Sequence, residues 1–223
     1  MQPKSNIWKN DTGFIWMLAI SIAMLISSQL TTGLVAESKF FIRLGFFFFT
    51  IVAVMYSALN TSMKLFGYVI SASLLLLAII MVRFETKTLE LVYSLISDSF
   101  LIFIIGLMVN QIFAGGSITG YKIGGGIAVY ILLGHLWASL YLTLYILQPD
   151  SFQYGGELIA SEEALKQLSY FSFVSLTTIG YGDITALNSF ARILVILEGL
   201  TGQLFPAIFI AKLVSLQIEG AKG

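Results

Sequence analysis

The chain has 223 residues, of which 57% are hydrophobic and only 11% are charged, and its mean hydropathy is +0.91. Soluble domains carry about a quarter of charged residues, so this composition excludes an ordinary soluble protein and indicates an integral membrane protein. The formal net charge is zero, which supplies no basic surface for a nucleic-acid partner, and the lack of cysteine excludes disulfides and thiolate metal sites.

The polar N-terminal segment, residues 1–13, is predicted to be cytosolic. A long apolar run follows it without the small-residue cleavage pattern of a signal peptide, so we expect this run to be a retained membrane span. A helix needs roughly 20 apolar residues to cross a hydrocarbon core about 30 Å thick. Six segments are long and apolar enough: Phe14–Leu34, Phe40–Leu59, Leu65–Val82, Tyr93–Phe113, Ile123–Leu147 and Phe190–Gln217. We therefore predict an all-α, multi-pass protein of the cell membrane, plasma or bacterial inner.

The first four spans are predicted to form a peripheral four-helix domain over residues 14–114, and a linker, residues 115–122, joins them to the last two spans. The glycine cluster Gly115–Gly126 lacks the Gly-x-x-x-x-Gly-Lys-Ser/Thr pattern of a phosphate-binding loop, so we interpret it as a pliable connection. His135 in the fifth span has no Cys, Asp or Glu within one helical turn. It is therefore interpreted as a hydrogen-bonded interhelical histidine and not as a metal ligand.

The segment between the fifth and sixth spans begins with residues 148–160, which carry Pro149, Gly155 and Gly156 and are predicted to form an exposed turret. Ser161 then resembles an N-cap, with Glu162 and Glu163 in the first turn, where negative charge suits the helix dipole. The helix predicted from there, residues 161–177, is too short to cross a bilayer. It should descend partway and stop.

A polar, glycine-rich run follows this short helix: residues 175–183 read SLTTIGYGD. Two glycines on either side of a tyrosine allow the backbone to adopt positive φ, so that successive carbonyl oxygens can face one axis. This run resembles the selectivity filter of potassium channels, which belong to the tetrameric pore-loop cation channels and select ions through rings of backbone carbonyls. The resemblance is specific over about residues 160–202 and otherwise depends on the number and order of the spans.

The resemblance implies a pore domain over residues 123–217 and a short C-terminal tail, residues 218–223. Its parts are an outer helix (123–147), the turret (148–160), a re-entrant pore helix (161–177), the filter (178–183) and an inner helix (189–217). Since the chain contains one filter run, four copies are needed to close one pore. The implied site residues are the K⁺-binding carbonyls of Thr178, Ile179, Gly180 and Tyr181, the filter glycine Gly182, the outer-mouth Asp183, and the filter supports Tyr170, Phe171 and Thr177. Tyr170 and Phe171 are expected to brace Tyr181 from behind, and no cofactor other than K⁺ is implied.

Two features of the last helix extend the resemblance, and one position departs from it. Gly202 lies 19 residues after Asp183, where the family often has a hinge glycine, and Pro206 follows one turn later. The alternative for Gly202 is close helix packing, which small residues permit in membranes. The departure is Val174, which stands where some members carry a carboxylate that braces the acid at the outer mouth.

Glu198 is the one carboxylate well inside the sixth span, ~13 Å below its outer start, where an ionised side chain facing lipid is costly. It shares a helix face with Gly202. It either lines the cavity below the filter, braces the filter in place of the carboxylate missing at Val174, or is a neutral, hydrogen-bonded acid without a role in conduction. The first two alternatives predict that Glu198→Gln lowers conductance or shortens filter openings.

The leading hypothesis is a homotetrameric potassium channel that conducts K⁺ passively across the bilayer. It should depend weakly on voltage, because the fourth span, Tyr93–Phe113, contains no Arg or Lys. The alternatives are a weakly selective cation channel and, from other classes, a non-conducting membrane scaffold or a membrane enzyme. No catalytic motif supports an enzyme. Lys and Arg are divided equally between the two sides, so the outward orientation of the filter is taken from the resemblance.

Overall fold

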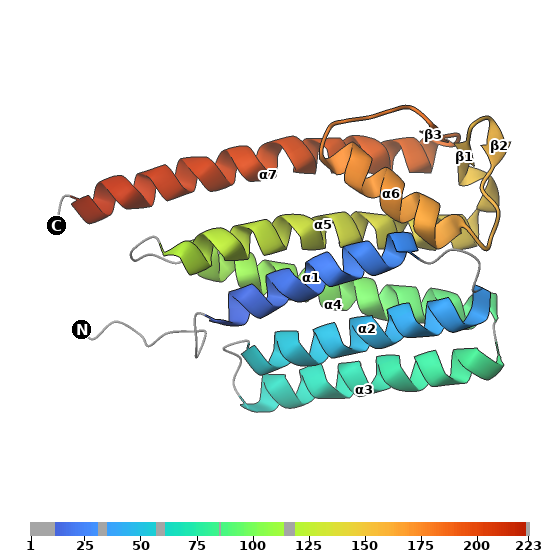
Figure 1. The fold of residues 1–223 in the computed structure, drawn as a ribbon, viewed down its shortest axis with the longest axis horizontal. Helices are drawn as coiled ribbons and strands as arrows, with labels where there is room; N and C mark the ends of the chain where they lie inside the picture. The colour runs from blue at the N-terminus through green and yellow to red at the C-terminus, as the bar shows by residue number, and fades with distance from the viewer. Residues whose placement is uncertain (1–11, 31–34, 57–60, 85, 114–118, 222–223) are drawn as a thin grey trace.

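The computed structural model describes residues 12–30, 35–56, 61–84, 86–113 and 119–221 (Figure 1). Most of these residues are helical, and the all-α membrane fold class predicted from composition is confirmed. The α-helices are α1 (Thr12–Leu30), α2 (Val35–Tyr56), α3 (Thr61–Arg83), α4 (Lys87–Phe113), α5 (Gly120–Leu147), α6 (Ala164–Leu176) and α7 (Ser189–Ala221).

Five of the described helices are long and apolar enough to cross a membrane. Their apolar stretches are Gly13–Leu30, Lys64–Arg83, Lys87–Phe113, Gly120–Leu147 and Ser189–Ser215. The predicted span Phe40–Leu59 corresponds to α2, whose described apolar part, Phe40–Met55, is shorter than the others. Residues 57–60 of that span lie outside the described part of the chain. A six-span topology therefore stays a prediction, with five spans supported by length and composition.

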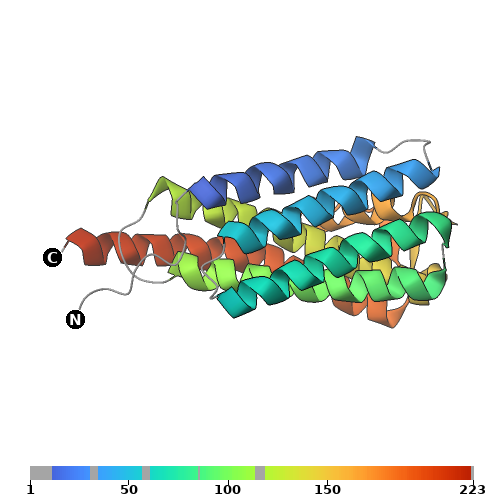
Figure 2. The same ribbon diagram turned by 90° about the horizontal axis from the view of Figure 1, so that it is seen from below.

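The long helices run broadly along the longest dimension of the molecule (Figures 1 and 2). Helix α5 lies centrally, because it packs against α1, α4, α6 and α7. Helix α6 has 13 residues, and at ~1.5 Å per residue it is too short to run the length of its neighbours. It slants between α5 and α7 at the end of the molecule that also holds the strands (Figure 1).

A three-stranded antiparallel sheet, in the order β2-β1-β3, lies beside α6 and α7 at this end of the molecule (Figure 1). The strands are β1 (Phe152–Tyr154), β2 (Glu157–Leu158) and β3 (Ile184–Ala186), and a short 3₁₀ helix, η1 (Pro149–Ser151), precedes them. The predicted exposed turret is thus partly a hairpin, and β1 pairs with the strand that follows the filter run. Gly155 and Gly156 form its turn with φ of 58° and 93°, a backbone region that favours glycine. Phe152 in β1 is fully buried, so the hairpin is anchored in the core.

Several helix boundaries differ from those predicted. Helix α5 begins at Gly120, three residues before the predicted start at Ile123, and α7 continues to Ala221 beyond the predicted end. Helix α6 begins at Ala164, so Ser161 is not its N-cap. The reason is a turn in which the Glu163 N–H donates to the Ala160 carbonyl at 3.0 Å, and no side chain caps the helix. Residues 1–11, 114–118 and 222–223, within the predicted N-terminal segment, linker and tail, lie outside the described residues.

Candidate pore-loop site

The backbone of the filter run alternates in the sign of φ from one residue to the next. Thr178, Gly180 and Gly182 have φ of 61°, 56° and 77°, while Ile179 and Tyr181 between them keep negative φ. An ordinary strand points successive carbonyls to opposite sides, whereas this alternation turns them toward the same side. The local geometry is therefore able to present a row of carbonyl oxygens along one edge of the chain.

Positive φ at Thr178 was not expected from the sequence, which predicted this conformation only for the two glycines. A β-branched residue rarely adopts it, and residues held in such strained conformations cluster at functional sites. The spacing of Gly180 and Gly182 could have predicted positive φ at Thr178, because Thr178 lies two residues before Gly180 and so continues the alternation.

The amide groups of the filter run point back toward the end of the pore helix. The Thr178 N–H donates to the Ser175 carbonyl at 2.9 Å, and the N–H groups of Ile179 and Gly180 donate to the Val174 carbonyl at 3.0 and 3.3 Å. Within the described residues, no hydrogen bond ends on the carbonyl oxygens of residues 178–181. These oxygens are therefore available to a ligand.

The outer end of the filter run is fixed by Asp183. Its Oδ2 accepts a hydrogen bond from the Tyr170 hydroxyl at 2.8 Å, its Oδ1 accepts one from the Ile184 N–H at 3.1 Å, and its carbonyl accepts one from the Gly155 N–H at 3.0 Å. The phenol is the donor in the first of these bonds, because an ionised Asp183 can only accept. The brace that is missing at Val174 is thus supplied one turn earlier in α6, by Tyr170.

Within the described chain, no ring contact joins Tyr181 to the two predicted aromatic supports, Tyr170 and Phe171. Phe171 packs instead against the rings of Tyr141 and Phe152, with centroids 5.3 and 5.8 Å away. Tyr181 is 71% exposed, and no ring contact joins it to another aromatic among the described residues. The bracing of Tyr181 by Tyr170 and Phe171 therefore stays a prediction.

The inner end of α6 is held by Thr177 and by α5. The Thr177 N–H and hydroxyl both donate to the Phe173 carbonyl, at 3.1 and 2.6 Å. The Leu176 carbonyl accepts from the Tyr130 hydroxyl of α5 at 2.9 Å. Because the last carbonyls of a helix have no partners inside it, these bonds and those of the filter amides complete its C-terminus.

Glu198 faces the pore helix and not an open cavity. Its side chain is fully buried between α5, α6 and α7, where it contacts the hydroxyls of Tyr141 and Ser172. The sequence left open whether Glu198 lines a cavity, and in this chain it does not.

Gly202, four residues further along α7, lies directly against the end of the pore helix. A Cβ at this position would overlap the Leu176 carbonyl oxygen and lie 2.8 Å from its carbon. Pro206 lies inside α7, which continues as a helix through it. The close packing of Gly202 is thus observed, while a hinge at Gly202 and Pro206 stays a prediction.

His135 lies between three helices, and the prediction of an interhelical histidine is confirmed. Its Nε2 lies 3.0 Å from the Ser21 carbonyl of α1, and its ring meets the edge of the Phe173 ring of α6 at 5.4 Å. No group of three or more possible metal-ligating side chains occurs among the described residues.

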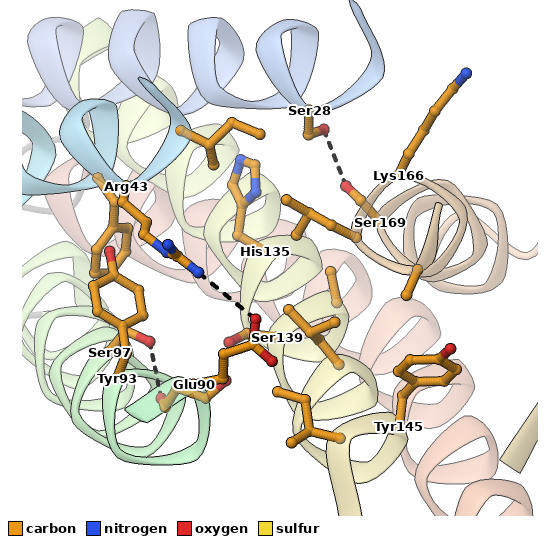
Figure 3. Close-up of a pocket in the computed structure, with 18 of the residues that line it drawn as sticks. Ser28, Arg43, Glu90, Tyr93, Ser97, His135, Ser139, Tyr145, Lys166 and Ser169 are labelled. Atoms are coloured by element: carbon orange, nitrogen blue, oxygen red, sulfur yellow. Dashed lines mark hydrogen bonds and ion pairs between the residues drawn. The ribbon is translucent and has the colours of Figure 1, made fainter. Parts of the chain in front are cut away.

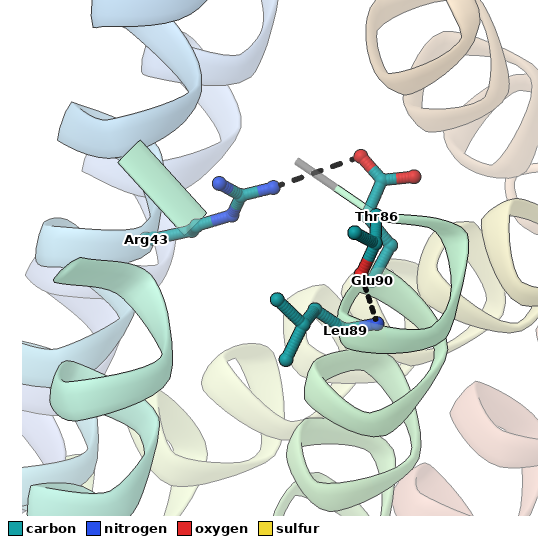
Figure 4. Close-up of polar contacts among 4 residues, drawn as sticks. All are labelled: Arg43, Thr86, Leu89 and Glu90. Carbon is teal, nitrogen blue, oxygen red and sulfur yellow. Dashed lines mark hydrogen bonds and ion pairs between the residues drawn. The ribbon is translucent and has the colours of Figure 1, made fainter. Parts of the chain in front are cut away.

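A cavity of about 480 Å³, which was not foreseen from the sequence, lies among the peripheral helices, α5 and α6 (Figure 3). Arg43 of α2 and Glu90 of α4 lie on its wall with Arg43 Nη2 3.9 Å from Glu90 Oε1 (Figure 4). The Arg43 guanidinium also lies 5.6 Å from the centre of the Tyr93 ring. Helical periodicity does not show which residues on different helices pair, so the sequence could not predict this ion pair.

Comparison with known families gives one match. Residues 127–218 match the model of a family described as "Ion channel", and this range runs from α5 through α6 and the filter run into α7. No curated protein matches the chain. The matched range contains the filter run, Glu198 and Gly202, but it leaves α1 to α4 uncovered. Together with the membrane-spanning helices, the match supports an ion channel of the pore-loop type.

Proposed function

We propose that the chain is one subunit of a homotetrameric, K⁺-selective channel of the cell membrane. The observation that carries this proposal is the filter backbone, in which φ changes sign at each residue from Thr178 to Gly182 and the carbonyls of residues 178–181 lack hydrogen-bond partners in the described chain. Four such runs around one axis would surround a dehydrated cation with carbonyl rings in place of its hydration shell. The ion is the cargo of the protein and not a resident cofactor.

The need for further copies follows from what one chain leaves uncovered. Ile179 and Tyr181 in the filter run are 55% and 71% exposed. Many apolar residues of α7 are also exposed: Phe190, Ile193, Ile196, Leu197, Leu200, Leu204 and Ile208. Exposed apolar surface of this extent fits burial against lipid and against neighbouring subunits, and one filter run per chain calls for a closed four-fold ring.

Charge at the filter end suits a cation pathway. Residues 148–192 contain five carboxylates, Asp150, Glu157, Glu162, Glu163 and Asp183, against two basic residues, Lys166 and Arg192. An acidic entrance raises the local concentration of cations. The C-terminal end of α6, with its partial negative charge, points toward the filter run and supports a cation in the same way.

Potassium flux across the membrane of liposomes tests the proposal. Purified protein is reconstituted with internal K⁺, and a K⁺ flux that Ba²⁺ blocks is the expected result. A scaffold or a membrane enzyme gives no such flux. Reversal potentials in mixed Na⁺ and K⁺ then separate a K⁺-selective pore from a weakly selective cation channel, because a weakly selective pore reverses near the value expected for equal permeabilities.

Conduction is expected to depend only weakly on voltage. Between Tyr93 and Phe113, α4 contains no Arg or Lys, and Lys87 stands at its first residue. Each charge that crosses the field contributes ~2.3 kcal/mol per 100 mV, so steep gating needs several of them. Conductance–voltage curves of the reconstituted channel measure this directly. A slope that requires several gating charges per channel would contradict the expectation.

A further inference from the structure

Glu198 joins the three helices of the pore module through a closed set of hydrogen bonds. Its Oε2 accepts from the Tyr141 hydroxyl of α5, and its Oε1 lies 2.5 Å from the Ser172 Oγ of α6. The glutamate is 0% exposed, and Ser172 is fully buried as well. Among the described residues no Lys or Arg pairs with Glu198.

The contacts of Ser172 indicate the protonation state of Glu198. Its Oγ also lies 2.8 Å from the Gly134 carbonyl of α5, which can only accept. An ionised Glu198 leaves three close oxygen–oxygen contacts, those of Tyr141 with Glu198, of Ser172 with Glu198 and of Ser172 with the Gly134 carbonyl, for the two protons of Tyr141 and Ser172. A neutral Glu198 adds the missing proton: the acid donates to Ser172, Ser172 donates to Gly134, and Tyr141 donates to the acid. Each of the three contacts then contains a proton, and no two oxygen atoms are held at hydrogen-bond distance without one.

A buried carboxylate without a cation is unfavourable, and the neutral acid avoids that cost. We propose that Glu198 holds its proton in the folded channel and acts, as a neutral acid, as the residue that positions the pore helix behind the filter. The inference rests on the proposed function, because it assigns Glu198 a role toward the filter of that channel.

The route from Glu198 to the filter is short. Ser172 lies two residues before Val174, whose carbonyl accepts the N–H groups of Ile179 and Gly180. A Cβ at Gly134 would lie 2.6 Å from the Phe173 ring, so α5 and α6 approach closely where Ser172 reaches the Gly134 carbonyl. A shift of α6 at Ser172 therefore moves the carbonyl on which two filter amides depend.

The neutral acid reverses the expectation that Glu198→Gln impairs conduction. A glutamine amide donates to Ser172 and its carbonyl accepts from Tyr141, so all three bonds are kept. Glu198→Ala removes the partner that Ser172 and Tyr141 share, so the Tyr141 hydroxyl loses its acceptor, Ser172 keeps only the Gly134 carbonyl, and a buried void remains between them. Unsatisfied buried groups and cavities are both destabilising.

Single-channel recording of the full-length reconstituted protein tests the positioning role. We expect Glu198→Gln to keep the wild-type conductance and mean open time within about twofold. Glu198→Ala should shorten the mean open time by roughly tenfold or more, because buried hydroxyls lose their partners. Asp98→Asn, which alters a buried carboxyl of α4 away from the filter, is the matched control and should resemble wild type. Equal losses in Glu198→Gln and Glu198→Ala, or no loss in either, would overturn the proposal.

Two further measurements complete the test. The first applies if Glu198→Ala fails to assemble, and the second distinguishes a failure of this inference from a failure of the proposed function. If Glu198→Ala does not form tetramers, two smaller changes replace it: Ser172→Ala removes the bonds to Glu198 and to the Gly134 carbonyl, and Tyr141→Phe removes one bond. Both should shorten the open time, and unchanged openings in both count against the role. The infrared difference spectrum of wild type minus Glu198→Gln should show the carbonyl stretch of a neutral carboxylic acid at neutral pH. Its absence refutes the neutral acid. A wild-type tetramer that conducts no K⁺ refutes the proposed function and the role toward the filter. The infrared band still shows whether Glu198 is neutral or ionised.

Discussion

Replacing Gly182 by aspartate, or Tyr181 by alanine, is expected to abolish K⁺-selective flux while the protein still inserts into the membrane. Gly182 has φ of 77°, a conformation that a residue with a side chain adopts only with strain. No atom lies within 4 Å of a Cβ at Gly182 in one chain, so the added carboxylate does not collide with the core of its own subunit. The loss should therefore fall on conduction and not on folding.

Tyr181→Ala acts on the same element by another route. The ring is 71% exposed in one chain, so its removal costs the isolated subunit little packing. In the proposed tetramer the ring would fill space around the filter, and its loss should let the carbonyl row relax and lose selectivity.

The measurement for both variants is K⁺ flux in liposomes with reversal potentials in mixed Na⁺ and K⁺, and flux should fall to the level of empty liposomes or lose its preference for K⁺. Gly106→Ala is the matched control, because this glycine is helical, lies in α4 and has open space around its Cβ position. Wild-type selectivity in either variant would contradict the assignment of residues 178–182 as the selectivity filter.

The sequence predicted well those parts of the pore module that depend on a pattern of neighbouring residues. An apolar run of about 20 residues indicates a span by its length alone, and the filter run is recognisable because glycine spacing controls which φ values are accessible. Helix α6 was found because a short amphiphilic segment precedes that run, although its start was placed three residues too early. Ser161 carries the composition of an N-cap, but a turn from Ala160 to Glu163 takes its place.

The three-stranded sheet was missed because its strands contain three, two and three residues, too few for any periodicity. Gly155-Gly156 between Tyr154 and Glu157 was the available signal, since such pairs often close hairpins. It was interpreted as an exposed turret. The pairing of β1 with β3 joins residues far apart in the chain, which no local pattern shows.

The orientation of Glu198 depended on packing between helices and so stayed open from the sequence. Glu198 and Gly202 share one face of α7, and that face lies on Ser172 and Leu176 of α6 because Gly202 leaves room for the Leu176 carbonyl. The glycine therefore decides where the glutamate points. From the sequence, the same two residues were equally compatible with a face turned to the cavity.

Gly202→Ala is accordingly expected to destabilise the assembled channel. The new Cβ would overlap a backbone carbonyl oxygen, which is not the movable end of a side chain, so α6 and α7 must separate. Overpacking of this kind costs about 1–3 kcal/mol, and here it acts on the helix end that carries the filter. Thermal unfolding of the purified protein and the fraction of tetramer on size-exclusion chromatography should both decrease relative to wild type.

The matched control is Gly199→Ala in the same helix, where no atom lies within 4 Å of the new Cβ. Alanine has the higher helix propensity, so this variant should assemble at least as well as wild type. The comparison also separates the two interpretations of Gly202. A hinge glycine predicts that Gly202→Ala assembles normally and opens less often, because alanine stiffens a helix that must bend. A packing glycine predicts the loss of stability before any channel can be recorded, and the overlap with Leu176 favours this second outcome.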